Sequence, residues 1–295
     1  MLLTPETSSE FVIFVYLYFE AMWNELQGRL LMEEGDAGGR PSAFTVPEGL
    51  TLAVLFSLSG ATDYKHFYSN FCIIWKGWFP RPTYKTFLEN IHRCFGIALV
   101  CLESLLKLFR RFFKGHVVDS TSLPVCHIKR DTSQKVTKHI ANKGYSTMGW
   151  FFGFKMHVVV SRQGFPLAVV ITKGSTDDRA PLETLLKDLS DTLIVADGGY
   201  VSQAIHDELR KKGIHFFVAP KKTMKKLMTA AQHLLLRSRQ IVETLFATLK
   251  YRMYMTSSLP RSLVGYFSRY IYALLANQLR RFAEVFFGKR KMLVS

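Results

Sequence analysis

The segment "TLIVADGGYVS", residues 192–202, indicates how this chain folds and where its chemistry lies. It begins with β-branched and apolar residues, which are typical of a buried strand. The strand runs into Asp197, which is followed by two glycines and a tyrosine. A carboxylate at the carboxyl end of a strand lies where α/β sheets bind their ligands. Since neither glycine has a Cβ, a bulky group can approach Asp197 closely.

Segments on both sides of this strand predict a mixed sheet. Apolar and aromatic runs predict strands over residues 116–121, 150–161, 166–172, 192–197 and 214–220. Helical spacing and capping residues predict helices over residues 176–189, 202–213 and 233–252. The order is therefore three strands, then helix, strand, helix, strand and helix. We predict an α/β fold with a mixed five-stranded sheet and flanking helices.

Residues 1–112 contain only helical patterns. The run "FVIFVYLYF", residues 11–19, is shorter than the ~20 residues that span a bilayer and predicts a core helix. A flexible link, "EEGDAGGRPS", follows at residues 33–42. Two later helices separated by Gly60 resemble a helix-turn-helix that would suit DNA, although an ordinary helical bundle explains the same pattern. We expect an all-α N-terminal region over residues 1–112 and a second domain over residues 113–295.

The charge of the chain points to its partner. It has 39 Lys and Arg against 23 Asp and Glu, which gives a net charge of +16. So large a positive charge indicates a polyanion, either nucleic acid or an anionic membrane surface. The acidic start "MLLTPETSSE" lacks the basic region of a signal peptide, so we expect a cytoplasmic protein without a membrane partner. The four cysteines show no C-x-x-C spacing, which argues against a zinc site.

Three acidic residues are candidates for metal binding. Asp119 and Asp197 both end apolar strands, and Glu243 lies at the edge of the buried face of the last helix. Arg239 and Lys250 share the helical face of Glu243, where a surface ion pair is the simplest explanation. Three acids without His or Cys suit Mg²⁺ or Mn²⁺, and such a cluster can hold two ions ~3.5–4 Å apart. Such a pair of ions serves phosphodiester cleavage or transfer. The net positive charge of the chain indicates that its partner contains phosphodiesters.

The strand order resembles the RNase H-like fold, and the acids resemble the Asp-Asp-Glu triad of DDE transposases from bacterial insertion sequences. In that family two aspartates end the first and fourth strands and a glutamate lies on the last helix, matching Asp119, Asp197 and Glu243. The glutamate stands in an R-x3-E-x6-K motif, which Arg239 and Lys250 complete. The resemblance implies that Asp119 bridges two Mg²⁺ or Mn²⁺ ions and that the other two acids each hold mainly one. Arg239 and Lys250 are expected to contact phosphate.

The resemblance also implies a reaction and an assembly. Water would attack the phosphodiester at each element end and free a 3′-hydroxyl, which would then attack target DNA without a covalent enzyme intermediate. The N-terminal region would bind the terminal inverted repeats, and a homodimer is expected because two ends must be joined. Such an enzyme would work in the bacterial cytoplasm, associated with the nucleoid.

The resemblance covers nearly the whole chain. "SLSGATDYKHFYSN", residues 57–70, is similar to the nine-eight-two subgroup of these transposases. The chain departs from the family at Leu236, where a tyrosine is common; this concerns a DNA contact and no metal ligand. Three alternatives stay open: a metal-dependent nuclease of the same fold, a catalytically inactive DNA-binding relic, and a protein that binds membrane surfaces.

Basic clusters lie near the expected site. The segment "PKKTMKK" precedes the last helix, and four lysines in it are expected to contact phosphate: Lys221, Lys222, Lys225 and Lys226. Residues 128–145 are interpreted as a second basic loop. Contacts of this kind make DNA affinity fall as salt rises. The adjacent Asp177 and Asp178 are interpreted as helix caps and not as site residues.

Overall fold

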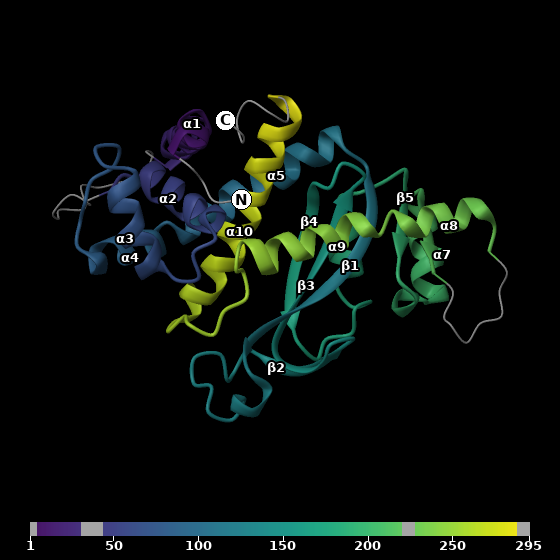
Figure 1. Cartoon of the computed structure of the whole chain (residues 1–295). Helices are drawn as coiled ribbons and strands as arrows, with labels where there is room; N and C mark the ends of the chain where they lie inside the picture. Colours follow the sequence, from purple (N-terminus) through teal and green to yellow (C-terminus); the bar gives the residue numbers. More distant parts are fainter. Residues whose placement is uncertain (1–4, 31–43, 220–227, 288–295) are drawn as a thin grey trace. The chain divides into compact units, whose positions relative to one another are not determined.

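The computed structural model describes residues 5–30, 44–219 and 228–287, and Figure 1 shows the order of their helices and strands. These residues fall into two compact units. The helical unit draws on residues 1–103, 249–255 and 259–295, and the sheet unit draws on residues 104–248 and 256–258.

The helical unit confirms the predicted all-α N-terminal region. Its described helices are α1 (Pro5–Leu30), α2 (Val46–Ser59), α3 (Tyr64–Ile74), α4 (Tyr84–Arg93), the first part of α5 (Phe95–Phe112) and α10 (Leu263–Phe286). Helix α2 is largely apolar, is buried along most of its length and packs against α1 and α10. Thr45 and Glu48 cap its first turn reciprocally, and Gly60 ends it at φ 73°, a conformation that glycine adopts without strain. None of the described helices is long and apolar enough to cross a membrane.

The C-terminal helix α10 belongs to the helical unit, whereas the sequence predicted one domain over residues 113–295. It packs against α2 and α4. Arg269 donates a hydrogen bond to the carbonyl oxygen of Thr62 over 2.6 Å, and its guanidinium lies over the ring of Phe56. Because these contacts join distant parts of the chain, a local sequence pattern does not reveal them.

The sheet unit is built on one mixed sheet. Its strands are β1 (Gly115–Cys126), β2 (Asn142–Ser146), β3 (Gly149–Ser161), β4 (Pro166–Lys173), β5 (Thr192–Ala196) and β6 (Ile214–Val218). The order is β2-β3-β1-β5-β6, with β4 also paired to β3. β3 runs antiparallel to its three neighbours, whereas β1, β5 and β6 are parallel. Both β2 and β4 pair with the edge of β3 opposite to β1, one after the other, so the sheet is five strands wide.

Helices flank this sheet, as predicted. They are α6 (Leu182–Leu186), α7 (Gln203–Lys211), α8 (Ala230–Arg237) and α9 (Gln240–Ala247). Helix α6 packs against β3 and β4, α7 against β6, and α9 against β1. A core cluster that includes Val118, Leu185, Ile194, Tyr200 and Phe216 joins α6 and α7 to the strands. A mixed sheet of this order with flanking helices is consistent with an RNase H-like fold.

Strand β1 is longer than predicted, so Asp119 lies within the strand and not at its end. The reason is pairing: β1 meets β5 only at Val117 but pairs with β3 as far as Cys126. The predicted basic loop over residues 128–145 also contains regular structure, because a 3₁₀ turn at Ile128–Arg130 and most of β2 fall inside it.

Two predicted helices are shorter in the structure. The helix expected over residues 176–189 is reduced to α6, because the carboxylate of Asp177 accepts hydrogen bonds from the backbone and side chain of Arg179 and holds a turn instead. The helix expected over residues 233–252 is interrupted between α8 and α9. There the hydroxyl of Ser238 bonds to a carbonyl of the preceding turn and competes with the helical ladder.

Candidate active site

Asp119 and Asp197 occupy matching positions on two neighbouring parallel strands. β1 and β5 pair where Val117 meets Val195, and each aspartate follows two residues later. Because side chains alternate between the faces of a strand, a step of two residues returns to the same face. The backbone of Asp197 is extended (φ −75°, ψ 162°) and continues the direction of β5. The two carboxylates therefore lie on one face of the sheet.

The guanidinium of Arg239 bridges these carboxylates. Its Nη2 donates to Oδ2 of Asp119 and its Nη1 donates to Oδ1 of Asp197, each over 3.1 Å. Arg239 stands at the N-cap of α9, which packs against β1. The sequence predicted an ion pair between Arg239 and Glu243 on one helix. The guanidinium pairs instead with one carboxylate within β1 and with one just after β5. One positive group thus holds both aspartates.

The two carboxylates differ in their surroundings. The side chain of Asp119 is 17% exposed and that of Asp197 is 53% exposed. Burial raises the pKa of Asp119, although Arg239 and the backbone N–H of Ser120 favour its charged form. Burial, and then the charge of Asp119, raises the pKa of Tyr200, so this phenol stays protonated. Nearby positive charge therefore favours the ionised form of Asp119.

A polar network beside Asp119 was missed by sequence reasoning. Oδ1 of Asp178 accepts hydrogen bonds from the hydroxyl of Ser120 over 3.0 Å and from the ammonium of Lys155 over 3.1 Å. Asp178 does not cap a helix, because α6 has Pro181 at its N-cap and no side-chain cap bond. The signal was Lys155 itself: a lone lysine in the apolar run "WFFGFKMHVVVS" needs a buried partner.

Glu243 does not complete a cluster of three acids. It is exposed on α9, four residues after Arg239. In the part of the chain that the structure describes, no three His, Cys, Asp or Glu side chains are placed to hold a metal ion together. The structure therefore brings Asp119 and Asp197 together with Arg239, whose guanidinium also interacts electrostatically with Glu243.

The other predicted DNA contacts are Lys250 and four lysines between β6 and α8. Lys250 lies in a π-helical turn, Thr248–Arg252, that continues from α9, and burial lowers the pKa of Lys250 to about 8. The predicted phosphate-contacting lysines between β6 and α8 lie outside the described residues: Lys221, Lys222, Lys225 and Lys226.

The residues present fit a hard divalent cation. Asp119 and Asp197 supply only oxygen donors, which Mg²⁺ and Mn²⁺ prefer. Both carboxylates pair with one positive group, the guanidinium of Arg239. A divalent cation that replaced this guanidinium would therefore meet two carboxylate ligands that are already in position. Asp119 is the better shielded of the two, and its ionised form gains most from such a cation.

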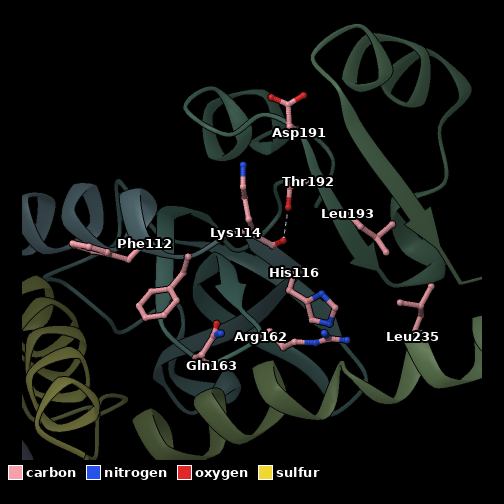
Figure 2. A pocket seen from close by; sticks show the side chains of 11 residues that line it. Phe112, Lys114, His116, Arg162, Gln163, Asp191, Thr192, Leu193 and Leu235 are labelled. Carbon is pink, nitrogen blue, oxygen red and sulfur yellow. Dashed lines mark hydrogen bonds between the residues drawn. The ribbon is translucent and has the colours of Figure 1, made fainter. Parts of the chain in front are cut away.

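A cavity of about 460 Å³ lies elsewhere on the sheet unit, toward the amino ends of β1 and β5 (Figure 2). Figure 2 shows the ring of His116 beside the side chain of Arg162, with Leu193 on the strand above. Asp119 lies farther along β1 and Asp197 lies just after β5, and neither residue lines this cavity. We therefore assign the cavity no part in the chemistry of the carboxylates.

Comparison with known proteins identifies the family of the chain. A family model described as a transposase DDE domain matches residues 112–263, which is more than half of the chain. The matched segment contains Asp119, Asp197 and Glu243. No curated protein matches the chain significantly. The chain therefore belongs to the family of transposases that share this DDE domain.

Proposed function

We propose that this chain is an insertion-sequence transposase that cuts DNA at element ends and joins the freed ends to target DNA. Membership of the transposase family supports DNA as the partner, and the net charge of +16 favours a polyanionic substrate. The observation that carries the proposal is the convergence of Asp119 and Asp197, from adjacent parallel strands, on Arg239. This arrangement suits a cation site beside a DNA phosphate.

Each residue has a role in this proposal. Asp119, Asp197 and Glu243 would hold Mg²⁺ or Mn²⁺, as two ions. Bound there, the ions supply activation of the attacking oxygen and stabilisation of the leaving oxygen. Arg239 releases the two aspartates, and its planar donors then contact phosphate, together with Lys250 and the lysines between β6 and α8.

The reaction follows from these roles. At the element end the oxygen of water forms a bond to phosphorus, the bond from phosphorus to the 3′ oxygen breaks, and that oxygen takes a proton to become a 3′-hydroxyl. This hydroxyl then attacks a target phosphodiester, forms a new bond to phosphorus and displaces the 3′ oxygen of the target. The chain itself forms no covalent bond to DNA.

The proposal extends to assembly and context. A homodimer holds two element ends together, and the helical unit binds their inverted repeats. Residues 57–70 support membership of the nine-eight-two subgroup. An enzyme of this kind acts on DNA of the bacterial nucleoid, in the cytoplasm.

A cleavage assay tests the proposal. The substrate is a labelled duplex of the DNA that flanks the gene and ends in a short inverted repeat, incubated with Mg²⁺ or Mn²⁺. We expect metal-dependent cleavage at the repeat boundary that is lost in Asp197→Ala and kept in Asp177→Ala. Asp177 is a matched control because its carboxylate is exposed and engaged by Arg179.

One alternative has an observation of its own. The bonds from Arg239 to both aspartates would also suit a relic that binds DNA without cutting it. Tight binding of the duplex without cleavage, in either metal and with two ends supplied, would favour that relic. Cleavage without joining to target DNA would favour a nuclease of the same fold.

A further inference from the structure

Asp178 lies beside the proposed metal ligand Asp119, and none of the roles above uses it. Its side chain is 33% exposed and comes from the turns that precede α6. The neighbouring Asp177 is 54% exposed and pairs with Arg179, so two adjacent carboxylates have different surroundings. The more buried of the two faces β1 and β3.

A chain of hydrogen bonds runs from Asp178 to Asp119 through one residue. Oδ1 of Asp178 accepts from the hydroxyl of Ser120 over 3.0 Å. The backbone N–H of Ser120 in turn donates to Oδ1 of Asp119 over 2.8 Å. The other oxygen of Asp119, Oδ2, is held by Arg239. When a metal ion displaces Arg239, the bond from Ser120 is left to orient the carboxylate.

A lysine holds Asp178 in turn. The ammonium of Lys155, 14% exposed, donates to Oδ1 of Asp178 over 3.1 Å and to the carbonyl oxygen of Thr176 over 3.0 Å. Nδ1 of His157 lies 3.9 Å from Oδ1 of Asp178. Burial lowers the pKa of His157 to about 4, however, so its ring is neutral. Lys155 therefore supplies the positive charge that fixes Asp178.

We propose that Asp178 is a positioning residue for the metal site: it holds Ser120, and Ser120 holds the Asp119 carboxylate in the orientation that binds the ion. This inference rests on the proposed function, because it needs Asp119 to be a metal ligand. Partners that orient a ligand in this way typically change metal affinity roughly 10–100-fold when they are removed. The negative charge of Asp178 also adds to the attraction for a cation nearby.

Metal affinity measured without DNA tests the inference. Mn²⁺ is titrated calorimetrically into the full-length protein and into Asp178→Ala, with Asp177→Ala as the matched control. We expect Asp178→Ala to weaken Mn²⁺ binding roughly 10–100-fold and Asp177→Ala to leave it unchanged. In the cleavage assay the Mn²⁺ concentration for half-maximal rate should rise in Asp178→Ala, while the rate at saturating Mn²⁺ stays close to wild type.

A second pair of variants keeps the test valid if Asp178→Ala folds poorly. Ser120→Ala removes the hydroxyl that Asp178 holds but keeps the backbone N–H and every charge. It should weaken Mn²⁺ binding in the same direction, Ser120→Thr should restore it, and Ser122→Ala on the same strand should have no effect. A purely structural role for the network would instead lower the melting temperature and leave Mn²⁺ affinity unchanged.

The outcomes separate the inference from the proposed function. If the wild type cleaves DNA and both Asp178→Ala and Ser120→Ala bind Mn²⁺ as tightly as their controls, the inference is wrong and the function stands. If the wild type binds Mn²⁺ at Asp119 but cleaves no DNA, the function fails, and the affinities of the variants still decide the role of Asp178. A wild type that binds no Mn²⁺ would overturn both.

Discussion

Arg239 donates a hydrogen bond to Asp119 over 3.1 Å, although 120 residues separate them in the sequence. The same guanidinium reaches Asp197. One arginine thus pairs with two carboxylates that the proposed reaction needs free. In the proposed function the arginine and the metal ion compete for the same two carboxylates, and this competition is measurable.

Arg239→Gln removes the cation that holds Asp119 and Asp197. We expect the metal-free protein to lose about 1–3 kcal/mol of unfolding free energy at neutral pH, most of it at the less exposed Asp119. Mn²⁺ should then stabilise Arg239→Gln more than it stabilises the wild type, because no guanidinium has to be displaced. Urea unfolding with and without Mn²⁺ measures both effects.

The control for this prediction is Arg179→Gln, which removes an exposed guanidinium from an exposed carboxylate, Asp177. It should change the free energy of unfolding little and the response to Mn²⁺ not at all. Equal stabilisation by Mn²⁺ in the wild type and in Arg239→Gln would contradict the competition.

Glu243→Gln should separate metal binding from catalysis. Glu243 is exposed and is not gathered with the two aspartates, so we expect the variant to bind its first Mn²⁺ nearly as tightly as the wild type. Cleavage of the element end should nevertheless be lost, because the third acid is needed once DNA and the second ion are present. Calorimetry and the cleavage assay, run on the same preparation, give the two readings. If Glu243→Gln weakened binding of the first Mn²⁺ as much as Asp119→Asn does, Glu243 would be a ligand of that first ion, and the prediction would be wrong.

DNA binding should depend on the charge of Lys250. Burial lowers the pKa of Lys250 to about 8, so the free protein carries this charge below that pH and loses it above. If Lys250 contacts phosphate, affinity for the element end falls as pH rises through about 8. Lys250→Arg should remove this dependence because arginine stays charged, and Lys250→Gln should bind weakly at every pH. Fluorescence anisotropy across this range is the measurement; an unchanged pH profile in Lys250→Arg would exclude the contact.

Much of the fold and part of the site were predictable from local sequence. Apolar runs such as residues 192–195 predict buried strands directly. The end of each such run shows where a polar side chain can lie on the sheet. Two parallel neighbouring strands bring such positions together. For this reason the sequence alone could predict that Asp119 and Asp197 lie close to each other. The helical region over residues 1–112 was equally clear from its periodicity.

Other features depend on contacts that sequence spacing does not encode. Strand β2 has the polar sequence "NKGYS" and exists because β3 pairs with it. Asp178 looks like its neighbour Asp177 in the sequence, and only the fold places it against Ser120 and Lys155. Arg239 likewise lies at the break before α9, and a sequence pattern that predicts one uninterrupted helix does not reveal this break.

The central claim is that Asp119 and Asp197 form the cation site of the enzyme. It is tested most directly by replacing Mg²⁺ with Fe²⁺ and generating hydroxyl radicals, which cut the protein backbone beside the bound ion. We predict cuts in β1 near Asp119 and after β5 near Asp197, which excess Mg²⁺ suppresses and Asp197→Asn abolishes. Cuts elsewhere in the chain, or cuts that persist unchanged in Asp197→Asn, would contradict the assignment.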